Sequence, residues 1–225
     1  LKEKALWKIL NATSFEDGIA IENISEDTVL EKLDTEAYFT LLDIPIPDEK
    51  EGIFHYLQQD KLILKEDTGN WSITNLGAIL LAKNLDEFNT VKRKGIRVIQ
   101  YRGNNKLETI REQVGNKGYA IDFENIIDIV DNIIPRNEVI GKALRKEVPM
   151  YPELAIRELI ANSVVHQDFS ISGTSPMIEI FEDRIEITNP GIPLVEADRF
   201  LDNPPKSRNE QLASFLRRIG VCEER

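Results

Sequence analysis

The chain has 225 residues, of which 41% are hydrophobic and 30% charged, with a formal net charge of −11 and a single cysteine. This composition is typical of a soluble globular protein with room for one large or two small domains, and it excludes a disulfide-stabilised scaffold. No apolar run of about 18 residues is present, so we expect no membrane span and no membrane partner; the lone Cys222 indicates a reducing, cytoplasmic location.

Residues 1–45 have an acidic balance and apolar residues at helical spacing, so we expect helices there, with Ser25 as an N-cap. The IPIP stretch that follows ends this pattern, because proline disrupts a helix. Beyond it, Asp48 and Glu51 have the spacing of a capping box, which predicts a helix over residues 51–59.

That helix is followed by the strand KLILK, the turn EDTGN, the strand WSI and a further helix, LGAILLAK, which begins at Thr74 or Asn75. Helix, strand, turn, strand, helix is the outline of a winged-helix unit. Winged helices often bind DNA, but residues 51–59 contain no arginine or lysine, and contact with phosphates needs cations. Packing or dimerisation, with a homodimer as one form, is therefore favoured over direct DNA binding.

The charge balance reverses between Lys92 and Lys117, where eight basic and two acidic residues give a net charge of +6. The preferred interpretation is a solvated strand edge or a contact with an acidic neighbouring domain, and nucleic-acid contact is the alternative. A strand over residues 95–102, a long amphipathic helix over residues 119–134 and a strand near residues 145–148 are predicted next.

A helix is predicted after Pro152, because apolar residues recur at three- and four-residue spacing. Glu158, Asn162 and His166 follow one another at i, i+4 and i+8, so they share one face beside the apolar stripe. Half-buried polar groups need partners, since each unsatisfied one costs about 1 to 3 kcal/mol. A cation, a nucleotide or a neighbouring strand would supply them.

A hairpin comes next, because MIEIF and RIEIT alternate with period two around a tight turn at Glu182 and Asp183. Its second strand runs into the rigid loop Asn189-Pro190-Gly191-Ile192-Pro193, which exposes its backbone. Ser207 and Glu210 then have the spacing of a capping box for the helix EQLASFLRRI, which ends at Gly220.

These residues suit a nucleotide pocket. Glu158 would polarise a water molecule for attack on a terminal phosphate, and the amide oxygen of Asn162 would ligate Mg²⁺. Asn189 would contact a purine, and Gly191 would let the backbone approach it closely. The structural alternatives are that Glu158 pairs with Arg184 or with the neighbours of Arg157, and that Asn162 caps a buried backbone group.

The remaining candidates also have two interpretations. Arg208 and Asn209, beside Ser207, would hold phosphate at the start of a helix, although capping alone explains Ser207. His166 is a candidate cofactor contact, and a hydrogen-bonded histidine at a helix end is the favoured interpretation.

The Glu158-x-x-x-Asn162 helix, followed by strands that end in Asn189-Pro190-Gly191, resembles the ATP-binding Bergerat fold of gyrase, heat-shock chaperones, histidine kinases and mismatch-repair proteins. More narrowly, RELIANSVVHQDF, FEDRIEITNPG and SRNEQLASFLRRIGVCEER resemble the RecG-related ATPase-like domain of bacterial transcriptional regulators, over roughly residues 140–225. ITNLGAILLAK and GIRVIQYRG resemble the middle of these proteins. In that family a Schlafen-type AlbA domain, a nucleic-acid-binding module, commonly precedes this region, and we expect it before Leu1.

The resemblance implies Glu158 as a base or water-positioning residue and Asn162 as a Mg²⁺ ligand. It also implies departures: Asn189 replaces the aspartate of the adenine-binding Asp-x-Gly-x-Gly, and Pro193 stands at its second glycine. An amide oxygen still accepts a hydrogen bond but lacks the charge that strengthens it. The glycine-rich lid would follow Arg225, so we expect an incomplete site and, at most, weak ATP hydrolysis by this fragment.

We therefore predict an α+β fold, with a winged-helix-like N-terminal half followed by a partial Bergerat (HATPase-like) α/β sandwich. The expected divisions are residues 1–90, a connecting region over 91–139, and an HATPase-like domain over 140–225. The predicted function is nucleotide-responsive regulation of transcription, with ATP and Mg²⁺ beside Asn162 and with DNA bound through a domain outside this chain. The alternative is a dimerisation or interaction module that has lost the nucleotide.

Overall fold

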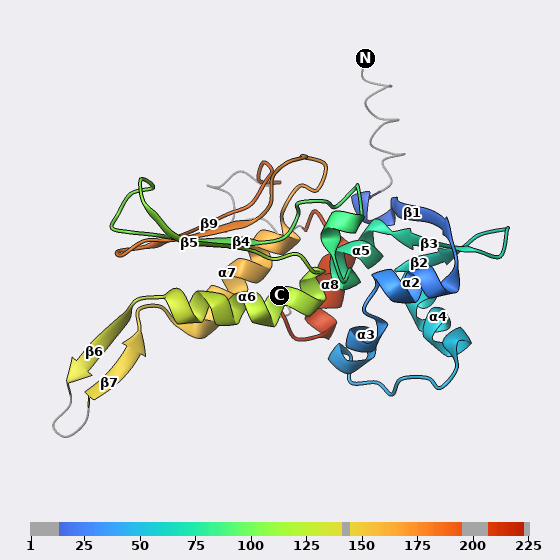
Figure 1. The fold of residues 1–225 in the computed structure, drawn as a ribbon. Coiled ribbons are helices and arrows are strands. Elements are labelled where there is room, and N and C mark those ends of the chain that lie inside the picture. The colour runs from blue at the N-terminus through green and yellow to red at the C-terminus, as the bar shows by residue number, and fades with distance from the viewer. Residues whose placement is uncertain (1–13, 141–144, 195–206, 223–225) are drawn as a thin grey trace, which may run out of the picture.

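A computed structural model describes residues 14–140, 145–194 and 207–222 (Figure 1). It contains a three-stranded sheet and a four-stranded sheet, each accompanied by helices, and a separate two-stranded hairpin. The predicted α+β class is therefore confirmed. One hydrophobic cluster runs through both halves, from Val29 to Val221. No helix within the described residues is long and apolar enough to cross a membrane.

The N-terminal half is built around an antiparallel sheet in the order β1-β3-β2. The expected helix, strand, turn, strand and helix are all present, and Thr74 caps the last helix by accepting a hydrogen bond from Gly77 N at 3.0 Å. That helix, α5, is buried along its whole length and contacts elements of both halves. The elements of this half are η1 (Phe15–Asp17), β1 (Ile19–Ile24), α2 (Glu26–Lys32), α3 (Thr35–Leu41), α4 (Lys50–Gln59), β2 (Ile63–Lys65), β3 (Trp71–Thr74), α5 (Asn75–Leu81) and η2 (Leu85–Glu87).

Two local predictions for this half are wrong. Residues 19–24 form strand β1 instead of a helix, because they pair with β3, about fifty residues along the chain. Asp48 does not cap α4: the N-cap position is Glu49, and no side chain caps that helix. The predicted N-cap Ser25 is confirmed, since its side chain accepts from Thr28 N at 3.3 Å.

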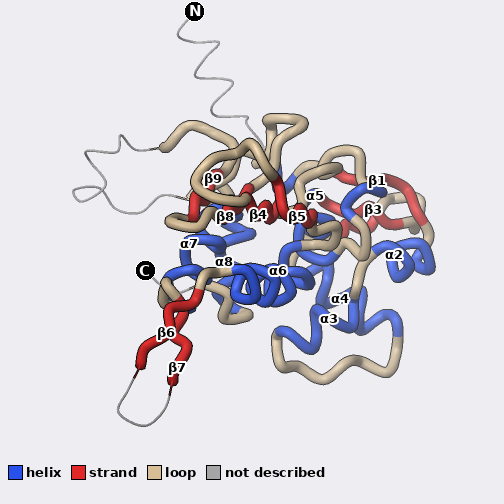
Figure 2. Tube along the Cα trace, turned by 60° about the vertical axis from the view of Figure 1, so that its left-hand side comes forward, coloured by secondary structure: helices blue, strands red, loops and turns tan. Residues whose placement is uncertain are grey.

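The C-terminal half is built on a four-stranded sheet in the order β5-β4-β8-β9, with helices along one face (Figures 1 and 2). The parallel pairing of β4 with β8 joins a strand from residues 91–139 to the hairpin from residues 140–225 in a single sheet. The predicted strands, hairpin and helices of this half are confirmed. Its elements are β4 (Arg97–Tyr101), β5 (Thr109–Val114), α6 (Tyr119–Ile133), α7 (Glu153–Val165), β8 (Met177–Ile180), β9 (Ile185–Thr188) and α8 (Glu210–Arg218).

Successive side chains along each strand of this sheet point to opposite faces, so every second one enters the core. Val98 on β4 and Ile178 on β8 are paired in register and almost completely buried under the helices. The opposite face carries a smaller cluster of Ile99, Tyr101 and Phe181. Beyond the sheet, β6 (Arg136–Ile140) and β7 (Arg145–Pro149) pair as a hairpin that projects away from the rest of the molecule (Figures 1 and 2).

The start of α8 is held by a residue from the other end of the chain. The carboxylate of Glu16, which is 2% exposed, accepts hydrogen bonds from Leu212 N at 2.6 Å and Gln211 N at 3.3 Å. The predicted capping box at Ser207 is wrong, because no side chain in the N-cap position of α8 bonds to its amides. A carboxylate at a helix N-terminus is stabilised by the free N–H groups, so Glu16 takes over the capping role.

Candidate functional site

The polar face of α7 carries the predicted Glu158 and Asn162. Both side chains are half-buried, and Asn162 Nδ2 donates to Glu158 Oε1 at 3.2 Å. This bond orients the amide so that its oxygen points away from the carboxylate. Cys222 lies close by, and burial, followed by the charge of Glu158, raises the pKa of its thiol. The structure thus brings together the two residues that the i, i+4 spacing paired.

His166 ends α7, where its backbone N–H donates to Asn162 O at 2.9 Å. Its side chain is exposed and makes no hydrogen bond within the described residues. Partial desolvation, followed by the positive charge of Arg208, lowers the pKa of the imidazole below its usual value of 6.5. The expected hydrogen-bonded side chain is therefore not found, and the lowered pKa favours the neutral form of the ring.

The loop after β9 is held by the protein itself. Asp168 N donates to Pro190 O at 2.7 Å, and Arg208 Nη2 donates to Ile192 O at 2.7 Å. Gly191 has a φ of +118°, and a Cβ there would lie 2.9 Å from Asp168 Cβ. Glycine is needed for this conformation and for the close packing. Two carbonyl groups of this loop are thus engaged within the chain.

The side chain of Asn189, the predicted purine contact, is exposed, and its one hydrogen bond within the described residues is a long 3.4 Å contact to Pro190 O. It faces solvent without the fixed orientation that recognition of a base needs. The residue is therefore available to a ligand, but the structure does not preorganise it.

Arg208 and Asp168 form the clamp on this loop, with Arg208 Nη1 at 3.1 Å from Asp168 Oδ2. Asp168 also accepts from the hydroxyl and the backbone N–H of Ser170, at 2.5 and 3.0 Å. The Ser170 hydroxyl, with smaller contributions from its N–H, Arg208 and Lys94, lowers the pKa of this carboxyl. The Nε of Arg208 is buried without a hydrogen-bond partner. The predicted phosphate contact Arg208 is thus occupied on its outer nitrogens.

Asn209 serves the connection between α7 and α8. Its Nδ2 donates to Val165 O at 2.8 Å and to Gln167 O at 2.9 Å, and the residue is 2% exposed. The side chain therefore satisfies the carbonyls that follow the end of α7. This arrangement assigns Asn209 a structural role in the conformation described.

From Gln167 a chain of hydrogen bonds between buried polar groups continues, which the sequence did not predict. Gln167 Nε2 donates to the Tyr119 hydroxyl at 2.9 Å, the Tyr119 hydroxyl donates to Lys94 O, and Lys94 Nζ donates to Ile171 O. Lys94, counted in the basic stretch, is 2% exposed and so does not join a solvent-facing cationic surface. The polar run His-Gln-Asp directly after an apolar helix is the signal that could have drawn attention to Gln167 and Asp168.

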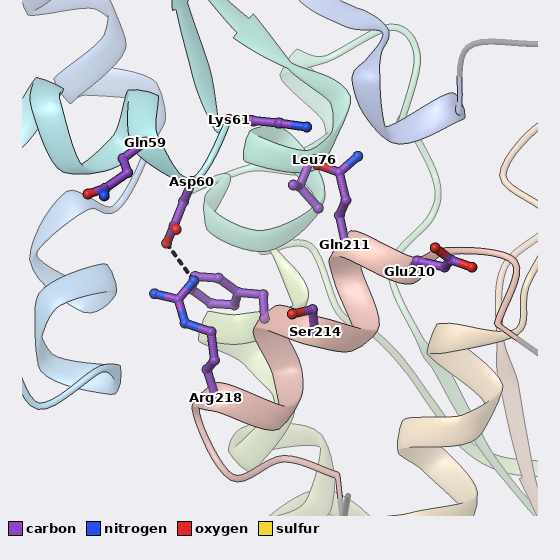
Figure 3. A pocket seen from close by; sticks show the side chains of 9 residues that line it. Gln59, Asp60, Lys61, Leu76, Glu210, Gln211, Ser214 and Arg218 are labelled. Carbon is purple, nitrogen blue, oxygen red and sulfur yellow. Dashed lines mark hydrogen bonds and ion pairs between the residues drawn. The ribbon is translucent and has the colours of Figure 1, made fainter. Parts of the chain in front are cut away.

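A pocket of about 260 Å³ lies where α8 meets the N-terminal half (Figure 3). Arg218 Nη1 bonds to Asp60 Oδ2 at 2.8 Å across it, and the Tyr38 hydroxyl donates to the same oxygen at 2.7 Å. None of the predicted site residues lines it. The lining residues are Gln59, Asp60, Lys61, Leu76, Glu210, Gln211, Ser214, Phe215 and Arg218.

The residues present fit one part of a Mg²⁺–nucleotide complex. The oxygen of Asn162 makes no hydrogen bond within the described residues, and amide and carboxylate oxygens are the ligands that Mg²⁺ takes. Those residues contain no group of three or more His, Cys, Asp or Glu side chains able to hold a metal ion, so the rest of its coordination would come from water and phosphate. The adenine side fits less well, because Asp168 and Arg208 engage the loop that would receive the base.

Comparison with known proteins gives a partial family match and a fold match. Residues 173–225 match the family model described as "Putative ATP-dependent DNA helicase recG C-terminal". The fold is similar to the crystal structure of the DIP2311 protein from Corynebacterium diphtheriae, with a TM-score of 0.65 and 17% sequence identity. That similarity covers 97% of this chain and 42% of the other one. None of the curated proteins compared with the chain matches its sequence.

Proposed function

We propose that the C-terminal half is a degenerate ATP-binding domain of the Bergerat type, and that it regulates a nucleic-acid-binding protein. In this proposal ATP and Mg²⁺ bind against the polar face of α7, and the N-terminal half is a winged-helix-like unit. The division near residue 90 separates the two parts, and residues 91–139 belong with the C-terminal half, because β4 pairs with β8. The match to the RecG C-terminal family over residues 173–225 supports the ATPase-type relationship.

The pairing of Glu158 with Asn162 carries the proposal. A carboxylate and an amide one turn apart are held together at 3.2 Å, half-buried, on the polar face of α7. The Asn162 oxygen would ligate Mg²⁺, and Glu158 would position a water molecule beside it. Bound Mg²⁺ would neutralise the charge of the phosphate oxygens.

Helix α8 offers a route from this face to the N-terminal half. Its start is fixed to the end of α7 by Asn209, and its first amides bond to Glu16. Farther along, Arg218 pairs with Asp60 after α4. A ligand that moved α7 or the loop after β9 would therefore disturb the hydrogen bonds at both ends of α8. That disturbance would shift the N-terminal half, and so change its contact with DNA or with a second copy of the chain.

Calorimetric titration of the full-length protein with ATP and Mg²⁺ tests this proposal. We expect saturable, Mg²⁺-dependent binding, weakened about tenfold or more in Asn162→Ala by loss of a charge-assisted contact. Asn132→Ala is the matched control, because Asn132 is an exposed α6 residue whose amide also donates four residues back, to Asp128 O at 2.7 Å. Equal affinity in both variants, or no binding by the folded protein, would contradict the proposal.

A second candidate function is an interaction module that no longer binds nucleotide. The engagement of Pro190 O by Asp168 N and of Ile192 O by Arg208 favours it, because the protein itself occupies the loop that would receive adenine. In that case ATP and Mg²⁺ would leave the oligomeric state unchanged in light scattering. A nucleotide-dependent change in mass would instead support regulation through a homodimer.

Direct DNA binding by the basic stretch is a separate question. Lys92 and Arg93 are exposed, whereas Lys94 is buried and bonded to Ile171 O. Neutralising Lys92 and Arg93 should therefore reduce the salt dependence of any DNA affinity, by roughly one released counterion for each contact. Absence of DNA binding at low salt would leave nucleic-acid contact to another domain.

A further inference from the structure

A second pocket lies at the beginning of β4 and β8, away from α7. Its volume is about 610 Å³, within the range of roughly 300 to 1,000 Å³ that is usual for small-molecule sites. Arg97 and Met177, the first residues of the two parallel strands, both line it. We call it the β4–β8 pocket. Its lining residues are Leu85, Asp86, Arg93, Gly95, Arg97, Val114, Gly115, Asn116, Gly173, Thr174, Ser175 and Met177.

Positive charge lines this pocket. Arg93 forms no ion pair with any residue that the structure describes, and Arg97 bonds to the exposed Glu112 at 2.6 Å. Asp86 is the one acidic side chain among the lining residues. Because Glu112 neutralises Arg97, the guanidinium of Arg93 is the cation that the pocket leaves for a ligand.

Residues 173–175, which also line the pocket, supply hydrogen-bond donors. The backbone N–H groups of Gly173, Thr174 and Ser175 donate to no acceptor within the described part of the chain. Gly173 has a φ of +73°, so the chain turns there, and successive N–H groups in a turn form a concave anion site. The Ser175 hydroxyl adds a further donor, whereas the Thr174 hydroxyl donates to Ile171 O at 3.4 Å.

The segment with Arg93 and the loop with residues 173–175 are fixed to each other before any ligand arrives. Buried Lys94, next to Arg93, donates to Ile171 O in the loop that leads to Gly173. Arg97 N donates to Pro176 O at 2.9 Å at the other end of that loop. Such preorganisation lowers the entropic cost of binding.

We propose that the β4–β8 pocket binds a small phosphate-bearing molecule. Its phosphate lies between Arg93 and the amides of residues 173–175, and its remaining part contacts Val114 and Met177. The proposal does not rest on the proposed ATP site, because the two share no residue. The hydrogen-bonded chain from Lys94 through Tyr119 and Gln167 links the pocket to Asn209 at α8, so a ligand here is placed to act as an effector.

Ribose 5-phosphate, inorganic phosphate and unphosphorylated ribose are the probes, titrated into the full-length protein and followed by calorimetry. We expect saturable binding of ribose 5-phosphate, weaker binding of inorganic phosphate and none of ribose. Arg93→Gln should weaken ribose 5-phosphate about tenfold, because it removes a charge-assisted hydrogen bond. Ser175→Ala should weaken it about threefold, because it removes one neutral hydrogen bond from a residue that lines the pocket.

Lys92→Gln is the matched control, since Lys92 is an exposed neighbour that does not line the pocket and carries the same charge. We expect its affinity to stay within about twofold of the original, as for a screened surface charge. Equal losses in Arg93→Gln and Lys92→Gln would overturn the proposal, because they would show general attraction instead of a site.

Two further experiments distinguish binding of a sugar phosphate in this pocket from binding at α7 and from binding of nucleic acid. Asn162→Ala should leave ribose 5-phosphate binding intact even where ATP binding fails, and a parallel loss would move the sugar phosphate to α7 and overturn the proposal. A ten-residue thymidine oligonucleotide should not displace ribose 5-phosphate. Displacement by tighter binding would identify nucleic acid as the ligand and also contradict a small-molecule site.

Discussion

The two halves of the molecule treat their buried polar groups differently. In the N-terminal half, Asn75 is 4% exposed and both ends of its amide are bonded, to Phe15 O at 2.8 Å and to the Thr90 hydroxyl at 2.6 Å. In the C-terminal half lie the three buried side-chain atoms without a partner within the described residues: Gln113 Oε1, Gln167 Oε1 and Arg208 Nε. Unused hydrogen-bonding capacity is costly, and natural proteins keep it mainly where a ligand or a moving part needs it.

This contrast suggests that the N-terminal half serves as a rigid scaffold, whereas the C-terminal half can bind ligands. The N-terminal sheet and its helices satisfy their own polar groups and present a continuous core. The C-terminal half instead combines the Glu158–Asn162 pair, the clamped loop at Gly191 and the β4–β8 pocket. We therefore expect substitutions in the first half to act on stability, and those in the second half to act on ligands as well.

The largest expected difference is between two buried amides. Asn75→Leu should lower the free energy of unfolding by about 2 to 4 kcal/mol, because it removes both hydrogen bonds of a buried amide and leaves Phe15 O without its donor. Gln167→Met should cost less, about 1 kcal/mol, because removal of the unpaired Gln167 oxygen offsets part of the loss of its bonds to the Tyr119 hydroxyl and Val164 O. Urea denaturation measures both; equal losses would remove the distinction between the halves.

Two left-handed glycines give the next comparison. Gly191→Ala should cost about 2 to 3 kcal/mol, because its φ of +118° disfavours a side chain and Asp168 Cβ would lie at 2.9 Å. Gly69→Ala in the N-terminal half should cost about 1 kcal/mol, since its φ is +86° but nothing lies within 4 Å. Thermal unfolding of the two variants checks the order, and a larger loss at Gly69 would show that the loop after β9 is not tightly clamped.

The contact of Glu16 with α8 should depend on pH. Burial raises the pKa of this carboxyl above its ordinary value of 4.5, so the folded state binds the proton more tightly than the unfolded state. This residue's contribution to stability therefore declines as pH rises from below 4.5 through the folded pKa. Glu16→Gln should remove that decline, and should cost roughly 1 to 2 kcal/mol at neutral pH because its NH₂ group would face an α8 amide.

Denaturation curves at several pH values test this behaviour. Glu22→Gln is a suitable control, because Glu22 is an exposed residue on the nearby strand β1. A pH dependence that survives in Glu16→Gln and disappears in Glu22→Gln would place the titrating group elsewhere.

The smallest expected effect concerns His166. Its pKa is lowered by desolvation and then by Arg208, so its contribution to stability is full above 6.5 and is lost as pH falls through the folded pKa. NMR titration should find a midpoint below 6.5, and Arg208→Gln should raise that midpoint by removing one positive charge. A midpoint unchanged by Arg208→Gln would separate this histidine from the clamp.

Local patterns predicted most elements but not the contacts between distant ones. The order of helices and strands around KLILK and WSI, and the hairpin of β8 with β9, follow from periodicity and turn residues. Strand β1 was missed because its pairing with β3 is remote in sequence, and its own residues have no clean alternation. The capping of α8 by Glu16, 196 residues before Leu212, leaves no local signal at either position.

In the candidate site, too, the sequence predicted local contacts but not those between distant residues. Helical spacing alone predicted that Glu158 and Asn162 are neighbours, because residues i and i+4 are adjacent on any helix. The clamp of Asp168 and Arg208 and the burial of Lys94 depend on how loops pack after folding. Charge counting placed Lys94 with the solvent-facing cations, whereas the fold buries it against Ile171 O.

Hydrogen–deuterium exchange of the full-length protein, with and without ATP and Mg²⁺, tests most directly whether the response belongs to the C-terminal half. We predict added protection in α7, in the loop after β9 and at the start of α8, with α3 and α4 unchanged. Protection confined to the N-terminal half, or exchange that ATP leaves unchanged everywhere in the folded protein, would contradict a nucleotide-responsive C-terminal domain.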